Sequence, residues 1–391
     1  MKTLPTPVRA LVQSLSGHPP DPPLAQNEQR KLLQLTDRTH CTLYLTGDPW
    51  ILGNGIACPT LAKNAERRKR LWAAYDEAAA TLSRNEIEFV LLKGFAQEVD
   101  SGLDPRLRYQ SDLDILCHPE DIARARIALQ QVGYREHGSA ALSDEHARPL
   151  VKPFTWQWRG DYFDPDLPIS IELHRSIWSG DRDRIRMPDI RESWGRRTTL
   201  AIEGRAIPAL AEPDRMAFAA LHVLRHILRN SASPAHAFEL AGMLKQRYAD
   251  QVFWEAWMRT QDDHSRALQT IAFQFASRWF GGSLSSAGEH EWQALPQPIH
   301  EWFHRYAFSP LVNLIQPNKD VLWLHLALLP RRIDRFAVAF RKLVPIHLRR
   351  TSELEGRLSR VRYHAVALAR ALVTSSRRRP AAPSTASQTS D

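Results

Sequence analysis

The spacing of hydrophobic residues changes twice along the chain, near residue 86 and near residue 212. In residues 61–85, LAKNAERRKRLWAAYDEAAATLSRN, apolar side chains recur every three or four positions among strong helix formers, which predicts a helix. Residues 87–93, IEFVLLK, are almost continuously apolar and predict a buried strand. Helical spacing returns at Pro213 and continues to about residue 345.

The stretch between these two changes alternates short strands with helices. Strands are predicted at 113–118 (LDILCH), 152–159 (KPFTWQWR) and 169–177 (ISIELHRSI), which contain β-branched or aromatic residues. A short helix is predicted at 95–102 and a longer one at 119–134, between a proline and a glycine. This alternation predicts a mixed α/β unit.

The fold class that follows is α+β, a small mixed β-sheet core with helices followed by an all-helical domain. Proline-rich sequence near the N-terminus and a low-complexity C-terminal end predict disorder at both ends. The expected organisation is a disordered N-terminus at 1–25, a helical segment at 26–84, the mixed core at 85–211, the helical domain at 212–345, and a basic helical segment with a disordered tail at 346–391.

Composition is that of a folded protein with more than one core. The 391 residues exceed one ordinary domain, and 43% of them are hydrophobic. Cys41, Cys58 and Cys117 show neither paired CxxC spacing nor zinc-ligand spacing. Together with the lack of an apolar N-terminal leader, this predicts a reducing, cytoplasmic location. The apolar run Val321–Leu329 is too short to span a bilayer.

The net charge of +9 is concentrated near the C-terminus. Residues 331–379 contain fourteen Lys and Arg against three Asp and Glu, so the rest of the chain is slightly acidic. Apolar residues in this segment have helical spacing. It could contact an anionic membrane surface, contact nucleic acid, or pack its apolar face on the helical domain, and the last interpretation is favoured.

Two aspartates lie two positions apart in the predicted strand SDLDIL. Residues i and i+2 point to the same face of a strand, so the Asp112 and Asp114 side chains project together. Their mutual repulsion raises the pKa of a carboxyl, and it is relieved either by a divalent cation or by exposure at a strand end.

A third carboxylate favours the cation. Glu172 lies in the apolar strand ISIELHR, where His174 shares its face. If this strand neighbours the one with Asp112 and Asp114, Glu172 would complete a metal site. His174 is expected either to orient a carboxylate or contact substrate, or to be a structural histidine. Gly94, after the first strand, permits a sharp turn and close approach of a phosphate to backbone amides.

These motifs resemble the polymerase-β-like nucleotidyltransferase superfamily. More closely, LLKGFA, RLRYQSDLDILC, GYR and IELHRSIW, with the downstream helix ALHVLRHILRN, resemble an uncharacterised nucleotidyltransferase family often associated with bacterial polysaccharide-biosynthesis gene sets. The resemblance covers residues 86–345. It implies a small mixed sheet followed by a helical substrate-side domain, and transfer of a nucleotidyl group from an NTP with Mg²⁺, or with Mn²⁺ in its place.

The resemblance also implies roles for individual residues. Asp112 and Asp114 match the metal-binding pair, Glu172 matches the third catalytic carboxylate, and Gly94 matches the glycine of the phosphate turn. The superfamily's usual Gly-Ser turn is replaced by Lys93-Gly94-Phe95, so the serine that contacts the triphosphate is missing. Either Lys93 binds the nucleotide phosphates as a point charge, or the donor is bound differently.

Other polar residues near these motifs have open interpretations. Arg108 is expected to pair with Asp112, to bind the γ-phosphate, or to be a surface arginine. His222 and His226 lie four positions apart on one helix face, but the pair lacks further ligands and the glutamate of an HExxH motif. A helix facing substrate is therefore expected in preference to a zinc site.

The leading hypothesis is an Mg²⁺-dependent nucleotidyltransferase acting on an NTP and an unknown hydroxyl-bearing acceptor, with nucleic acid not required. A second hypothesis is a catalytically silent relative that binds a nucleotide or a partner. A third is an adaptor that uses 331–379 on a membrane or nucleic acid. The polysaccharide association, if it holds, favours a membrane-peripheral position in the cytoplasm.

Overall fold

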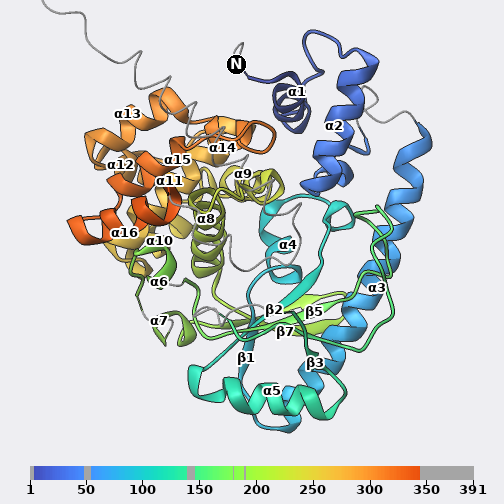
Figure 1. The fold of residues 1–391 in the computed structure, drawn as a ribbon. Helices are drawn as coiled ribbons and strands as arrows, with labels where there is room; N and C mark the ends of the chain where they lie inside the picture. Colours follow the sequence, from blue (N-terminus) through green and yellow to red (C-terminus); the bar gives the residue numbers. More distant parts are fainter. Residues whose placement is uncertain (1–3, 48–53, 139–145, 179, 189–190, 344–391) are drawn as a thin grey trace, which may run out of the picture.

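The computed structural model describes residues 4–47, 54–138, 146–178, 180–188 and 191–343. A seven-stranded mixed sheet in the order β3-β4-β5-β2-β1-β7-β6 forms the core, with helices around it and a largely helical region after it (Figure 1). This confirms the expected fold class. The strands are β1 (Phe89–Leu91), β2 (Asp112–Cys117), β3 (Arg135–Glu136), β4 (Leu150–Val151), β5 (Ser170–His174), β6 (Thr198–Ile202) and β7 (Arg205–Ala209).

The centre of the sheet is the pair β2 and β5. These strands run parallel, whereas β1 runs antiparallel to β2 on its other side. The register places Asp112 opposite Ser170 and Asp114 opposite Glu172. Because side chains alternate along a strand, this register also fixes which face each of these polar side chains occupies.

The two faces of the sheet are covered by different parts of the chain. On one face, Leu113 and Ile115 of β2 and Leu173 of β5 belong to a hydrophobic cluster with α3 (Asn54–Arg84) and α5 (Ile122–Gln131). On the other face, Leu92 and Leu116 pack with Phe218 of α8 (Glu212–Leu228). Asp112 and Asp114 alternate with Leu113 and therefore lie on the α8 side.

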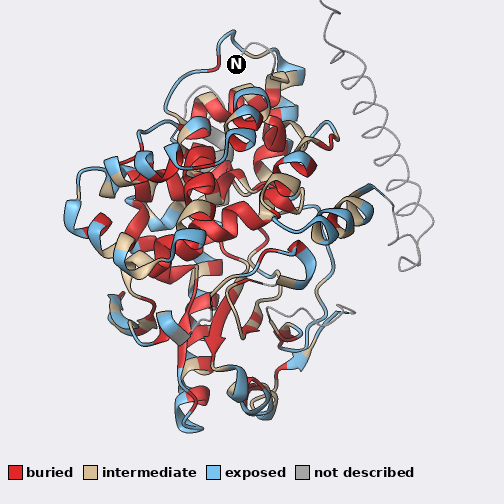
Figure 2. Ribbon diagram, turned by 90° about the vertical axis from the view of Figure 1, so that its left-hand side faces the viewer, coloured by how far each residue is buried: buried red, intermediate tan, exposed pale blue. Residues whose placement is uncertain are grey.

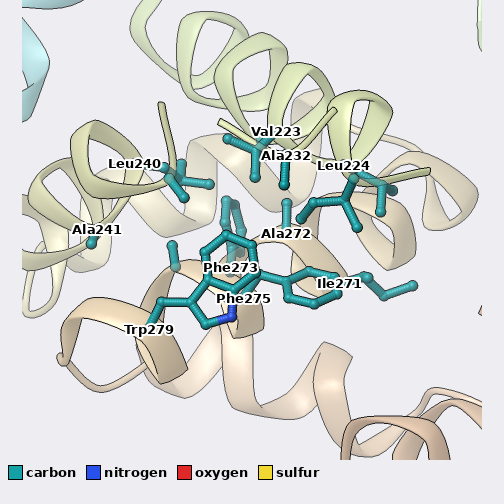
Figure 3. Packing of buried hydrophobic residues seen from close by; sticks show 14 of the residues in the cluster. Val223, Leu224, Ala232, Leu240, Ala241, Ile271, Ala272, Phe273, Phe275 and Trp279 are labelled. Carbon is teal, nitrogen blue, oxygen red and sulfur yellow. The ribbon is translucent and has the colours of Figure 1, made fainter. Parts of the chain in front are cut away.

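The helical region has its own large core. Figure 3 shows Leu224 of α8, Leu240 of α9 and the aromatic rings of Phe273 and Trp279 of α11 packed together, and Figure 2 shows the helices around this core as mostly buried. The helices after α8 are α9 (Pro234–Arg247), α10 (Gln251–Thr260), α11 (Asp263–Phe280), α12 (Ser286–Gln293), α13 (Gln297–Tyr306), α14 (Ser309–Val312), α15 (Asp320–Ala327) and α16 (Arg332–Leu343).

The prediction of a disordered N-terminus at 1–25 is wrong for α1 (Thr6–Leu15). Its apolar residues, among them Val8, Leu11 and Leu15, have helical spacing and are buried in the same cluster as α8 and α11. A proline in the first turn starts the helix, where its missing N–H costs nothing. The proline content of residues 1–25 indicated disorder, but burial of this apolar stripe stabilises α1 as a helix. The next elements are α2 (Gln26–Arg38) and a short 3₁₀ helix, η1 (Thr42–Leu45).

Two other local predictions differ from the structure. Residues 152–159 form no strand, although β4 ends just before them, and Trp158 is exposed. The hairpin of β6 and β7 was not predicted, because its Glu203-Gly204 turn lacks the usual Asn-Gly or Asp-Gly signal. The short helix expected at 95–102 is confirmed as α4 (Phe95–Ser101).

The last part of the predicted organisation cannot be compared with the structure, and the remaining described elements are short. The predicted tail at 346–391 lies outside the described residues, as does the side chain of Cys58. Within the described ranges, no helix has both the length and the apolar character needed to cross a bilayer. The short elements are η2 (Pro105–Leu107), η3 (Pro119–Asp121), α6 (Gly180–Asp183) and α7 (Arg191–Trp194).

The core and the helical region are joined by buried polar contacts. Arg215 of α8 makes two 2.7 Å hydrogen bonds to the carboxylate of Asp100 in α4, and both side chains are buried. Gly242 of α9 approaches α4 so closely that a Cβ there would lie 2.3 Å from the carbonyl oxygen of Ser101. The helices α4 and α9 therefore meet backbone to backbone.

Replacement of this glycine tests the junction. We expect Gly242→Ala to lower the free energy of unfolding by about 1–3 kcal/mol, because the added methyl group overpacks a backbone contact. Gly195→Ala is the matched control, since a Cβ at Gly195 meets nothing within 4 Å. Urea unfolding measures both variants. Equal stability of the two would contradict the close approach of α4 and α9.

Candidate functional site

Three carboxylates gather on the side of the sheet that faces α8. Asp112 and Asp114 project from β2, and Glu172 projects from β5 beside Asp114. Their neighbours Leu113 and Leu173 point into the opposite hydrophobic cluster, which fixes this orientation. Asp114 is almost fully buried, whereas the side chains of Asp112 and Glu172 are 25% and 22% exposed. The cluster therefore has a buried anchor and two accessible members.

Lys93 supplies a positive charge among these carboxylates. It follows β1, and its Nζ lies 3.0 Å from Asp114 Oδ2 and 3.9 Å from Asp112 Oδ2. Burial opposes its charge, but the neighbouring carboxylates of Asp112 and Asp114 prevail and raise the pKa of Lys93. Lys93 is thus held protonated at the end of an apolar strand.

His174 fixes the buried aspartate. Its Nε2 lies 2.8 Å from Asp114 Oδ1, a distance at which Nε2–H donates to the carboxylate, and 3.7 Å from Glu172 Oε2. Burial lowers the pKa of His174. The pKa of Asp114 is lowered because Lys93 and His174 together outweigh its own burial. Since His174 is only 2% exposed, its position suits orientation of Asp114 better than contact with substrate.

The cluster has more negative charge than its lysine balances. Burial and the charges of Asp114 and Asp112 raise the pKa of Glu172 to about 8, and burial raises that of Asp112. Asp114 Oδ2 is buried and makes no hydrogen bond within the described residues, although the Lys93 ammonium is close. Ligand atoms of Asp114, Glu172 and His174 lie within 4.8 Å of one another. Excess charge and oxygen donors fit a hard divalent cation.

The loop before β2 is held by a buried arginine of α3. Arg67 is 0% exposed and donates to the carbonyl oxygens of Gln110 and Ser111, at 2.7 and 2.8 Å, and of Leu167 at 2.7 Å. One guanidinium thereby fixes the entries to both β2 and β5. Arg67 therefore holds in position the segments that lead into the two strands with the carboxylates.

Gly94 lies directly beside this loop. Its φ of +69° is in the region that favours glycine, and a Cβ would lie 2.2 Å from Gln110 Nε2. Gln110 in turn donates from Nε2 to the carbonyl oxygen of Asp112 at 2.6 Å. A side chain at position 94 would push this glutamine away from the strand that carries Asp112.

A cavity of about 400 Å³ separates this face of the core from the helices. Lys93, Gly94 and Asp112 line it on the core side, and residues of α8 and α9 line it on the other. Pockets at the junction of two structural units are common ligand sites. Lining residues from the helical side include His222, His226, His236 and Glu239.

Arg108 lies in the cavity wall, but it does not pair with Asp112 as one interpretation of the sequence expected. Its Nε lies 3.0 Å from Glu239 Oε1, and its Nη2 donates to Glu239 Oε2 at 3.3 Å. The hydroxyl of Tyr44 donates to the same carboxylate at 2.7 Å. Both charged side chains are buried. The Arg108 charge is therefore largely compensated by α9.

The two histidines of the helix expected to face substrate both line the cavity. His222 Nε2 and His226 Nε2 lie 2.7 Å apart, and the ring of His236 from α9 lies 4.7 Å from that of His222, centre to centre. Helical spacing alone placed the first two on one face. His236 was not predicted.

The residues that the sequence did not reveal act through contacts between distant parts of the chain. Glu239 is an acidic residue in an ordinary amphipathic helix, and Arg67 is one of four basic residues in the run ERRKR. Nothing in a single sequence distinguishes the buried arginine of such a run from its exposed neighbours. For His236, the available signal was a third histidine ten residues after His226 in a region of helical spacing.

A family model identifies the family to which this chain belongs. A family model described as an uncharacterised nucleotidyltransferase matches residues 58–281, more than half of the chain. No curated protein matches. Among solved structures, an antigenic nucleotidyltransferase-like protein from Paracoccidioides brasiliensis matches with 15% identity and a TM-score of 0.26, over 49% of this chain and 89% of that one.

Removal of the lysine tests the charge balance of the carboxylate cluster. We expect Lys93→Met to lower the free energy of unfolding by about 3–5 kcal/mol in EDTA, because buried carboxylates lose their partner. Mg²⁺ should stabilise this variant more than it stabilises wild type. The control Lys63→Met breaks a half-exposed ion pair with Asp161 and should change stability by about 1 kcal/mol at most. Urea unfolding with and without Mg²⁺ measures these effects. Equal losses of stability in Lys93→Met and Lys63→Met would refute the idea that Lys93 compensates the carboxylate charge.

Proposed function

This chain belongs to the family of uncharacterised nucleotidyltransferases, and on that premise we propose that it transfers a nucleoside monophosphate from an NTP to a hydroxyl-bearing acceptor with the help of Mg²⁺ or Mn²⁺. One observation carries the proposal. Asp112, Asp114 and Glu172 lie on the same side of two paired strands, near Lys93, and of this group Asp112 and Lys93 line the cavity.

The residues that would hold the metal are Asp112, Asp114 and Glu172. Asp114 is oriented by His174 and buried, so it is the fixed ligand, while the two partly exposed carboxylates complete the set. Once bound, the metal would neutralise charge on the phosphate oxygens and help to align the reacting groups. His174 is a positioning residue in this proposal, since it acts through Asp114.

Lys93 and Gly94 form the phosphate side of the cavity. The Lys93 ammonium is held at the cavity wall by carboxylates, and Gly94 leaves the backbone open to a close approach. This supports Lys93 as the replacement for the missing serine. Arg108 reaches a phosphate only if Glu239 releases it, so we place it behind Lys93 as a nucleotide contact.

Glu172 is the residue we assign to the acceptor. In the transfer, the acceptor oxygen bonds to the α-phosphorus, the bond from that phosphorus to the bridging oxygen breaks, and diphosphate leaves with its electron pair. The acceptor proton goes to the Glu172 carboxylate. Glu172 suits that role because its side chain is 22% exposed and lies on the same side of the sheet as Asp114. His222 and His226 line the opposite wall, where an acceptor would lie.

The test is transfer of label from each α-labelled NTP in the presence of Mg²⁺. Acceptors offered are protein, RNA, saccharides and a cell extract. We expect wild type to transfer label, and Asp112→Asn and Asp114→Asn to lose several kilocalories per mole of transition-state stabilisation, a rate loss on the order of 10³-fold. Asp166→Asn, at a well-exposed position, is the control and should keep full activity.

Two results would contradict the enzyme. Equal transfer by wild type and by both variants would show that the carboxylates do not catalyse it. NTP binding in calorimetry without transfer to any acceptor pool would favour the catalytically silent relative. That alternative predicts that Lys93→Met weakens NTP binding while no variant changes turnover.

A second candidate function rests on α16. The apolar side chains Ile333, Phe336 and Phe340 are 74%, 70% and 47% exposed, at spacings that place them on one side of the helix. Within the described residues, Val338 is the buried hydrophobic side chain of this helix. Val338 packs into the hydrophobic cluster of the helical region, as the favoured interpretation expected, whereas Ile333, Phe336 and Phe340 stay exposed. Exposed aromatic residues beside arginines are typical of helices on anionic membranes.

Vesicle binding tests this membrane contact. We expect the full chain to sediment with vesicles of anionic lipid at low salt and to be released as salt increases, because basic side chains contribute attraction. Phe336→Ser with Phe340→Ser should reduce binding about tenfold or more, since two buried rings contribute well over 1.4 kcal/mol. Val252→Ser, another exposed apolar position, is the control. Binding that is independent of Phe336 and Phe340 would remove α16 as the contact.

A further inference from the structure

A second group of ligating side chains lies across the cavity from the carboxylates. His222 and His226 come from the last turns of α8, and His236 comes from the first turn of α9. One ring nitrogen of each lies within 4.8 Å of the others. The ring centroids are 4.5 Å apart for His222 and His226 and 5.6 Å apart for His226 and His236. All three line the cavity.

The local fold holds these three rings together. Spacing of four residues places His222 and His226 one turn apart on the same side of α8. The chain then turns back after Asn230, whose φ is +58°, and Ser233 caps α9 by accepting from the backbone N–H of His236 at 3.4 Å. This cap fixes the start of α9, and hence the position of His236.

The rings are in the form that metals bind. Burial is the first cause that lowers the pKa of all three, to about 4 for His226, and nearby cations such as Arg225 add to the effect for His222 and His226. The imidazoles are therefore neutral at physiological pH. Neutral imidazole is a preferred ligand of Zn²⁺ and of related transition metals.

The hydrogen bonds leave ring nitrogens available. His226 Nδ1 lies 3.2 Å from the carbonyl oxygen of Ser231, so donation there leaves the Nε2 lone pair, which accepts from His222 Nε2–H at 2.7 Å. A metal ion would take the place of this shared proton, with His222 then protonated at Nδ1. His236 Nδ1 is buried and has no hydrogen-bond partner among the described residues. Leaving a buried nitrogen unpaired costs free energy, which a bound cation would recover.

We propose that His222, His226 and His236 form a binding site for a transition-metal ion of the Zn²⁺ type, separate from the carboxylate site. Tetrahedral Zn²⁺ with Zn–N bonds of about 2.0–2.1 Å needs ligand nitrogens about 3.3 Å apart. The observed separations of 2.7 Å between His222 Nε2 and His226 Nε2 and of up to 4.8 Å within the group require ring rotations that move His222 and His226 slightly apart. The site goes beyond the proposed nucleotidyl transfer.

Donor chemistry keeps the two sites distinct. The sheet offers carboxylate oxygens, which suit Mg²⁺, and the helices offer three imidazole nitrogens, which suit Zn²⁺. Lys93 and Arg108 line the same cavity and disfavour a second cation, whereas Asp112 and Glu239 offset them. Three protein ligands leave a fourth position toward the cavity. The ligand class that fits there is an oxygen donor, such as a hydroxyl or phosphate group.

Cobalt binding tests the site without reference to catalysis. Purified full-length protein is freed of metal with a chelator and titrated with Co²⁺ alone, read by visible absorption, and then with competing Zn²⁺. We expect one Co²⁺ per chain at the histidines, displaced by Zn²⁺. His226→Gln and His236→Gln should each weaken binding on the order of 100-fold or more, because loss even of an outer-shell partner costs about 10–100-fold.

Matched variants locate the ion. His40→Gln changes a histidine that lines the same cavity but lies outside the group, and Asp112→Asn changes the carboxylate site, so both should keep the Co²⁺ spectrum. Thermal unfolding checks that each variant is folded, and Zn²⁺ should raise the wild-type melting temperature but not that of His236→Gln. No stoichiometric binding, unchanged binding by His236→Gln, or loss in Asp112→Asn alone would overturn the proposal. Nucleotidyl transfer is scored separately, so either idea fails without the other.

Discussion

The parallel pairing of β2 with β5 is the constraint on which the site depends. It brings Asp114 beside Glu172, and strand alternation adds Asp112 on the same face. Three acids so close together would repel each other, and neighbouring side chains reduce that repulsion or hold the strands in place. Lys93 contributes a cation, His174 holds the buried acid, and Arg67 of a distant helix clamps the loops that lead into both strands.

Much of this could be predicted from the sequence because it rests on short-range periodicity. A spacing of two placed Asp112 and Asp114 together, and apolar flanks marked their strand as part of a sheet. Lys93, Asp112 and Glu172 come together because of the strand order, which was not predicted; the family resemblance supplied only the joint role of Asp112, Asp114 and Glu172. The part that failed depended on contacts between remote segments: Arg108 meets a glutamate 131 residues away, and α1 owes its order to burial against the helical region. Sequence spacing carries no record of such contacts.

The cavity joins two kinds of wall. The sheet contributes oxygen donors on rigid, buried strands, and the helices contribute nitrogen donors that burial keeps neutral. The secondary structure of each wall sets its ligands. Alternation along a strand places Asp112 and Asp114 on one face, and a spacing of four residues in a helix places His222 and His226 on one side. The same solvent space is therefore bordered by a carboxylate oxygen donor that suits Mg²⁺ on one side and by imidazole nitrogens that suit transition metals on the other.

For the proposed transfer, the junction of α4 with α8 and α9 also limits which acceptors would enter the cavity. The Arg215–Asp100 pair and the contact at Gly242 join the two walls through buried contacts, which movement of one wall away from the other would have to break. A space of about 400 Å³ is near the lower end of ligand pockets, which span roughly 300–1,000 Å³. A polymer cannot fit its length into such a space. If the proposed acceptor is a macromolecule, it would have to present a protruding terminus or a single side chain, and the rest of it would be recognised on the outer surface.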